Sequence, residues 1–284
     1  MDEQLVRGLL QEQHPDLADL PLRQVVGGWD NQQWRLGDDL AVRLPRTPRA
    51  PELLRKEYRW LPELAPRLPL PVPVPQRIGE PTEQFPHTWL VTTWVPGEPA
   101  DRTPIGDEQA ADTLASFLRA LHVEAPADGP VSPDRGVPLR TLDRGFEQGF
   151  ASVEVDDAVR KIWAEAVAAP EWTGPPIWLH GDLHPANVVV EDGALTGVID
   201  FGDLSVGDPA HDLAAAWILL PDGAAERFFE VYAVADEAMI TRARGCAAGK
   251  ALALISIGDA GDKGLPGGKP TWGPAGRRTL ERLL

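Results

Sequence analysis

The sequence predicts an α+β protein of two lobes, the first an antiparallel sheet plus a helix and the second mostly helical. Short β-like runs separated by turn residues fill residues 22–44. After residue 107, apolar residues recur at helical spacing in most segments. Between 177 and 200, apolar runs alternate with polar loops, a pattern typical of strands that end at a site. We expect the first lobe to span residues 1–95 and the second 96–284.

The first lobe is predicted to begin with an amphipathic helix over residues 2–13, because its leucines share one side. An antiparallel meander follows, with strands at 22–26, 33–36 and 40–44. A second helix begins near Pro51. A proline-rich extended segment then leads to a strand pair at 74–78 and 88–94.

The second lobe is predicted to be built from helices that bury one apolar face each. They are expected at residues 107–122, 156–169, 211–220, 224–235, 237–254 and in a last segment that ends at 284. His122 ends the first of them and is interpreted as a C-terminal cap. Residues 124–140 are rich in Pro, Gly and Asp and are expected to form a loop.

The stretch from Trp178 to Asp212 carries the chemistry. Two apolar strands bracket polar loops that hold Asp182, Asn187 and Asp200. A carboxylate can accept a hydroxyl proton, and amide and carboxylate oxygens are ligands that Mg²⁺ prefers. The spacing from Asp182 to Asn187 equals that of Asp and Asn in the protein-kinase catalytic loop. The pattern therefore favours phosphoryl transfer.

The run HGDLHPAN, followed by IDFGD and DPAHDLA, resembles the aminoglycoside phosphotransferase family, whose members have a protein-kinase-like fold and phosphorylate small molecules. The resemblance implies that Asp182 is the catalytic base and that Asn187 and Asp200 bind Mg²⁺. It implies that Asp212 is a buried support of the catalytic loop. Two histidines of the run, His180 and His184, are expected to support the same loop.

The resemblance also assigns the nucleotide site to the first lobe. Gly27 and Gly28 lie where kinases place a loop over the phosphates, although the two glycines on their own favour a simple hairpin turn, because no G-x-G-x-x-G pattern is present. Residues 88–94 correspond to the hinge that meets the purine, and Thr92 and Trp94 are the candidates there. Trp94 either stacks on the base or packs against protein.

Arg43 stands in the place of the lysine that usually anchors the α- and β-phosphates. Arginine can hold phosphate with two hydrogen bonds, so the role is compatible with this residue. Its expected partner is Glu57, on the helix that begins near Pro51. The alternative is that Arg43 is a surface residue of its strand.

The composition of the chain limits which binding partners and which cellular location are expected. With 27 Lys and Arg against 43 Asp and Glu, the formal net charge is -16. Such a charge repels nucleic acids and anionic membranes. It either attracts cationic small molecules or serves only to keep the protein in solution. A single cysteine excludes disulfides within the chain. Neither a signal pattern nor a membrane-spanning run is found, so we expect a cytoplasmic protein. We also expect it to be a monomer or a dimer.

We therefore expect transfer of the γ-phosphate of ATP or GTP, with Mg²⁺, to a hydroxyl of an antibiotic such as an aminoglycoside, a macrolide or a nucleoside antibiotic. This reaction would inactivate the antibiotic and confer resistance. A kinase of choline-like, sugar or amino-alcohol metabolites would carry the same motifs. A nucleotide-binding regulator without activity and a metal-dependent hydrolase that uses His180, Asp182, His184, Asp200 and His211 are further alternatives.

Overall fold

The computed structural model covers the whole chain and describes residues 1–25 and 28–284. The chain divides into two compact units. The first unit contains Met1–Pro96 and Val198–Gly202, and the second contains Gly97–Gly197 and Asp203–Leu284. Among the described residues, no helix combines the length and the apolar character needed to cross a membrane.

The first unit contains a five-stranded antiparallel sheet with the strand order β1-β2-β3-β5-β4. Its strands are β1 (Leu22–Val25), β2 (Asn31–Leu36), β3 (Leu40–Pro45), β4 (Pro75–Gly79) and β5 (Trp89–Thr93). Val42 at the centre of β3 pairs with Trp34 on one side and Val91 on the other. The predicted antiparallel sheet is confirmed, with strand ends within two residues of those expected.

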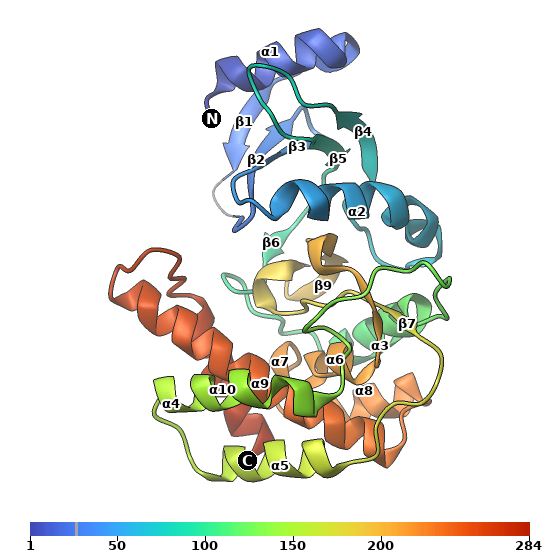
Figure 1. The fold of residues 1–284 in the computed structure, drawn as a ribbon, viewed down its shortest axis with the longest axis vertical. Coiled ribbons are helices and arrows are strands. Elements are labelled where there is room, and N and C mark those ends of the chain that lie inside the picture. The colour runs from blue at the N-terminus through green and yellow to red at the C-terminus, as the bar shows by residue number, and fades with distance from the viewer. Residues whose placement is uncertain (26–27) are drawn as a thin grey trace. The chain divides into compact units, whose positions relative to one another are not determined.

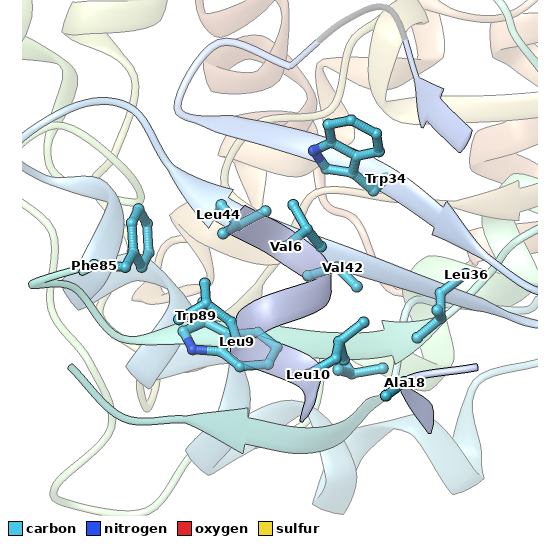
Figure 2. Packing of buried hydrophobic residues seen from close by; sticks show 11 residues of the cluster. Val6, Leu9, Leu10, Ala18, Trp34, Leu36, Val42, Leu44, Phe85 and Trp89 are labelled. Atoms are coloured by element: carbon cyan, nitrogen blue, oxygen red, sulfur yellow. The ribbon is translucent and has the colours of Figure 1, made fainter. Parts of the chain in front are cut away.

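Helix α1 (Glu3–Gln13) covers one face of this sheet (Figure 1). Its N-terminal end is capped by Asp2, whose carboxylate accepts a hydrogen bond from the backbone N–H of Leu5 at 3.0 Å. Figure 2 shows the core that results, in which helix and strand side chains interdigitate. Its members are Val6, Leu9, Leu10, Ala18, Trp34, Leu36, Val42, Leu44, Phe85, Trp89 and Val91.

Helix α2 (Ala50–Leu64) also belongs to the first unit. Pro51 lies in the first turn of this helix, where a backbone N–H makes no hydrogen bond within the helix, so the lack of an N–H in proline costs nothing. Leu54 and Leu61 are fully buried on one face of this helix. Glu57 lies on the same face and is also fully buried. A buried carboxylate on an apolar helix face requires a partner, which places Glu57 in the candidate site described below.

The second unit holds two small sheets on either side of the segment that carries Asp182. Strand β7 (Ile177–Leu179) pairs with β10 (Ser205–Gly207) in antiparallel fashion. The other sheet has the order β6-β8-β9, made of β6 (Glu98–Pro99), β8 (Val188–Glu191) and β9 (Ala194–Val198). The segment between β7 and β8 is therefore held at both ends by strands.

Helices make up the rest of the second unit. They are α3 (Ala110–Leu121), α4 (Asp143–Ser152), α5 (Ala158–Ala168), α6 (Ala210–Leu213), α7 (Ala215–Ile218), α8 (Ala224–Tyr232), α9 (Glu237–Asp262) and α10 (Trp272–Leu283). The long helix α9 packs against α10 and α5 (Figure 1). The mostly helical character predicted for this part of the chain is confirmed.

Helix α4 was not predicted, because two glycines lower its helix propensity and only two phenylalanines mark its apolar face. Tertiary contacts stabilise it instead. The ring of Phe146 stacks on that of Trp163 of α5, with centroids 4.3 Å apart. Gly149 packs against Leu252 of α9.

Two predicted boundaries in this unit are wrong. The apolar helix expected over 211–220 consists of two single turns, α6 and α7, which meet at Ala214. Helix α9 was expected to end at 254 but continues to Asp262. Its last turns pack backbone to backbone, since a Cβ on Gly258 would lie 2.3 Å from the nitrogen of Gly273. Glycine is tolerated there because the close approach requires it.

Candidate active site

The segment between β7 and β8 forms a tight polar loop that ends in a single 3₁₀ turn, Pro185–Asn187. Gly181 has a φ of 83°, and a Cβ at this position would lie 2.3 Å from the carbonyl oxygen of Asp203. Only glycine fits such a position. The loop therefore folds back closely on the residues that precede β10, and Asp182 follows directly after this bend.

The side chain of Asp212 of α6 holds this loop in place by hydrogen bonds to the backbone of the loop. Its carboxylate, which is almost fully buried, accepts hydrogen bonds from the N–H groups of His180 at 2.6 Å and Gly181 at 3.0 Å. His122 Nε2 lies 3.3 Å from the same carboxylate. Burial alone would raise the pKa of Asp212, but the hydrogen bond with His122 and the charges of the surrounding histidines hold it below its usual value. Asp212 is therefore ionised at neutral pH.

His122 is the C-cap residue of α3, as the sequence predicts, and its backbone N–H donates to the carbonyl oxygen of Leu118 at 2.7 Å. Its side chain has a further role. Its Nδ1 lies 2.8 Å from the hydroxyl of Tyr232, and its Nε2 is directed at Asp212. The buried carboxylate at Asp212 attracts the ring away from the helix end, because an unpaired buried charge is costly. The loop is thus connected through Asp212 to His122 at the end of α3, and through His122 to Tyr232 of α8.

Replacing Asp212 with Asn should lower the free energy of unfolding by about 3 kcal/mol. The amide cannot accept both loop N–H bonds and also keep the negative charge that faces His122. Because the pKa of Asp212 is depressed in the folded protein, its contribution is present at neutral pH and is lost as the pH falls through that lowered pKa. Urea denaturation at neutral and acid pH measures both effects. Equal stability of the variant and the wild type at neutral pH would contradict this account.

Asp182 lies in a cluster of donors from three parts of the chain, with 24% of its side chain exposed. The ammonium group of Lys250 on α9 donates to its Oδ1. The amide of Asn187 donates to its Oδ2 at 3.3 Å, and Nε2 of His184 lies 3.5 Å from that oxygen. Partial burial would raise the pKa of Asp182, but Lys250 and His184 hold it well below its usual range. The carboxylate is therefore ionised and fixed in orientation.

Two histidines of the loop have clear hydrogen-bonding roles. Nδ1 of His184 accepts from the backbone N–H of Ala186 at 3.3 Å, so Nε2, which faces Asp182, carries a proton. Nδ1 of His180 accepts from the N–H of Asp182 at 3.2 Å. His211, by contrast, bonds the carbonyl oxygen of Gly181 through Nε2 at 2.9 Å. All three rings hold the backbone of the loop.

Arg135, in the loop that precedes α4, brings a second cation to this cluster. Its guanidinium lies 3.6 Å from Asp203 and 4.0 Å from Oδ1 of Asp182, and it pairs with Asp134 at 2.9 Å. The loop itself was expected, but this contact was not. No local pattern marks Arg135 or Lys250, because both reach Asp182 only through the tertiary fold.

Arg43 and Glu57 form a buried ion pair in the first unit. Only 3% of Arg43 is exposed, so it is not the surface strand residue that was the alternative. Burial raises the pKa of Glu57, and the guanidinium of Arg43 limits that rise. Arg43 Nε and Glu57 Oε1 have no hydrogen-bond partner of their own, although both are buried. Such unsatisfied groups are typical of a binding site.

Asp200 lies beside this pair, with Oδ1 at 3.4 Å from Arg43. Its backbone φ of 63° lies in the left-handed region, which Asp enters more readily than most residues other than glycine. Its side chain is 43% exposed, so carboxylate oxygens are accessible. In the second unit, Asn187 uses its Nδ2 to donate to Asp182, which leaves the amide oxygen as its ligand atom. Both are hard oxygen donors that suit Mg²⁺.

The remaining nucleotide-site candidates are less clearly placed. Gly28 has a φ of 73°, and a Cβ there would lie 2.3 Å from the carbonyl oxygen of Asn31, so the turn itself requires glycine. Gly27 lies outside the described residues. Thr92 is buried between β3 and β4, opposite Ala41 and Pro75.

Trp94 directly follows β5 and has two contacts that bear on the stacking hypothesis. Its backbone N–H donates to the carbonyl oxygen of Asp39 at 2.7 Å. The guanidinium of Arg35 lies 5.0 Å from the centre of its indole ring. A cation therefore already lies over one face of the ring, which leaves at most one face for a base.

The metal-hydrolase alternative requires several of these side chains to converge on one ion. In the part of the chain that the structure describes, no group of three or more His, Cys, Asp and Glu side chains is arranged in that way. The rings of His180 and His184 instead bond backbone N–H groups of their own loop.

Known proteins resemble the chain in both sequence and structure. The model of the phosphotransferase enzyme family matches residues 21–249. An aminoglycoside 3'-phosphotransferase of Escherichia coli is 28% identical over an alignment of 220 residues, with 68% of this chain and 78% of that protein covered. Viomycin phosphotransferase of Streptomyces vinaceus is 28% identical over 170 residues, or 51% and 54% of the two chains.

Solved structures give the same answer for the fold. The GDP and kanamycin complex of APH(2")-IIia has a TM-score of 0.71 at 19% identity, and covers 98% of this chain and 97% of its own. A macrolide 2'-phosphotransferase of Brachybacterium faecium has a TM-score of 0.66 at 26% identity, with 97% and 98% covered. The kinase-like fold is thereby confirmed. With its family model matched over most of its length, the chain belongs to the phosphotransferase enzyme family.

Proposed function

We propose that this phosphotransferase moves the γ-phosphate of ATP or GTP to a hydroxyl group of an antibiotic and thereby inactivates it. The observation that carries the proposal is the fixed, ionised carboxylate of Asp182, held by Asn187, His184 and Lys250 in a loop that Asp212 fastens. Related enzymes act on aminoglycosides and macrolides, which makes these two classes the first acceptors to test.

Asp182 acts on the acceptor hydroxyl in this proposal. An acceptor that hydrogen-bonds to the carboxylate is oriented for in-line attack on the γ-phosphorus. As the new oxygen–phosphorus bond forms, the bond between the γ-phosphorus and the β–γ bridging oxygen breaks, ADP or GDP leaves, and the carboxylate takes the hydroxyl proton. Because its pKa is low, Asp182 contributes mainly by orienting the hydroxyl and takes the proton late. Asn187 and His184 keep its second oxygen in place during this step.

Arg43 is proposed to hold the nucleotide phosphates, with Glu57 fixing the guanidinium in its buried position. The accessible carboxylate of Asp200 beside this pair and the amide oxygen of Asn187 would hold Mg²⁺. When bound, the ion neutralises negative charge on the phosphates. Complexes of related enzymes contain GDP or ADP, so either purine is compatible. We place the reaction in the cytoplasm, where both nucleotides are abundant.

Asp200→Ala should remove Mg²⁺-dependent nucleotide binding, because it deletes the one charged oxygen ligand of the proposed site. Calorimetric titration with ATP and GTP, each with and without Mg²⁺, measures this effect. In the wild type, Mg²⁺ should tighten binding, and in the variant it should have no effect. A variant that keeps the full Mg²⁺ dependence would rule out Asp200 as a ligand.

The proposed function is tested by nucleotide consumption with a panel of acceptors. The panel contains aminoglycosides, macrolides, nucleoside antibiotics and small amino-alcohols, each with ATP and with GTP. Stimulation by one antibiotic class is the expected result and identifies acceptor and donor together. Stimulation by the amino-alcohols alone would replace the antibiotic function with that of a metabolite kinase.

A further inference from the structure

Lys250 places a positive charge directly on the proposed catalytic carboxylate. It lies on α9, 68 residues from Asp182 in the chain, and its ammonium donates to Oδ1 of Asp182. Its side chain is 19% exposed, so it lies largely within the protein. The contact joins two elements of the same unit and needs no bound molecule to form.

Other cations and donors surround the same carboxylate. Arg135 lies 4.0 Å from Oδ1 of Asp182, and the second oxygen faces Asn187 and His184. The neighbouring carboxylate of Asp203 is itself paired with Arg135 at 3.6 Å. The chain's own cations therefore neutralise the acidic groups at this position, despite the net charge of -16 for the whole protein.

This arrangement bears on the acceptor. The reacting hydroxyl has to reach hydrogen-bond distance of Asp182, which brings the substituents on its neighbouring carbon atoms close to Lys250. An ammonium group there is repelled by Lys250 and finds no unpaired carboxylate among Asp182 and Asp203. An uncharged or acidic substituent meets no such repulsion.

We infer that Lys250 is a specificity-determining residue, which selects acceptors whose reacting hydroxyl has an uncharged or acidic neighbour over acceptors with an ammonium neighbour. The inference rests on the proposed function, because it assumes that the acceptor hydroxyl binds at Asp182. It narrows that function, and it differs from the expectation, drawn from overall acidity, that a cationic acceptor is favoured.

Binding measurements test this inference without requiring turnover. The probes are kanamycin, which has amino groups beside its hydroxyls, and fully N-acetylated kanamycin, in which the same positions are uncharged. Calorimetry compares the wild type with K250M, which keeps the length of the side chain without its charge. K250R keeps the charge, and K263M removes an exposed lysine at the end of the same helix as the matched control.

We expect the wild type, K250R and K263M to bind N-acetylated kanamycin more tightly than kanamycin. In K250M, kanamycin affinity should rise at least about tenfold, and affinity for the acetylated probe should change little. Unchanged or weaker kanamycin binding in K250M would overturn the inference. Circular dichroism checks folding, and K250Q replaces K250M if the latter does not fold.

The outcome is separable from that of the proposed function. If no nucleotide-dependent phosphorylation is found with any acceptor, the proposed function fails, and the affinity ratio of the two probes still shows whether Lys250 excludes ammonium groups. If phosphorylation is found and the K250M ratio equals that of the wild type, the function stands and the role assigned to Lys250 is wrong.

Discussion

Asp182→Asn should reduce turnover by about 10²- to 10⁴-fold, the range typical of the loss of a general base. The amide can neither take a proton nor balance the charge of Lys250. Nucleotide affinity should remain close to that of the wild type, because Arg43 and Glu57 belong to the other unit. The measurement is steady-state kinetics with the acceptor found in the panel, together with calorimetric titration of nucleotide.

Asp192→Asn is the matched control for this substitution. Asp192 is an exposed turn residue directly after β8, with a φ of 51° that Asn also adopts readily. The same chemical change there should leave turnover unaltered. Near-normal turnover of the Asp182 variant would remove Asp182 from the reaction.

Arg43→Met should lower the free energy of unfolding by about 3 to 5 kcal/mol, because it leaves the carboxylate of Glu57 buried without a counterion. The double variant R43M/E57L removes both charges and should recover most of that loss, since apolar side chains of similar volume can replace a buried ion pair. Both variants should lose nucleotide binding if the guanidinium holds the phosphates. Comparison of the single and double variants thus separates the contribution of Arg43 to stability from its contribution to nucleotide binding.

Urea denaturation and nucleotide titration of the single and double variants provide the data. A double variant that is stable and still binds ATP or GTP normally would show that Arg43 has only a structural role. A single variant as stable as the wild type would show that Glu57 becomes protonated at little cost, as its raised pKa allows.

Local patterns were sufficient to predict much of the fold and the centre of the site. Alternation and turn residues locate the five strands of the first unit to within two residues. The loop that carries Asp182 is recognisable because its polar residues interrupt two apolar strands, and Asp212 lies on the helix turn expected to support it. These features depend on residues that are close together in the sequence, so they can be read from the sequence itself.

The features that escaped prediction depend on contacts between distant segments. Lys250 looks like an ordinary helix residue, and only the packing of α9 brings it to Asp182. Helix α4 is stabilised by the stacking of Phe146 on Trp163 rather than by the helix propensity of its residues. His122 ends its helix as predicted, but the contact of its side chain with the buried charge of Asp212 was not predicted. Such contacts are set by tertiary structure and leave no local signal.

Direct detection of the phosphorylated acceptor is the most decisive measurement. The acceptor from the panel is incubated with nucleotide, Mg²⁺ and either the wild type or Asp182→Asn, and the product is analysed by mass spectrometry and ³¹P NMR. The account predicts one phosphate ester on one hydroxyl with the wild type, and a rate lower by at least about 100-fold with the variant. Nucleotide consumption without a phosphate ester on the acceptor, or equal ester formation by both proteins, would contradict it.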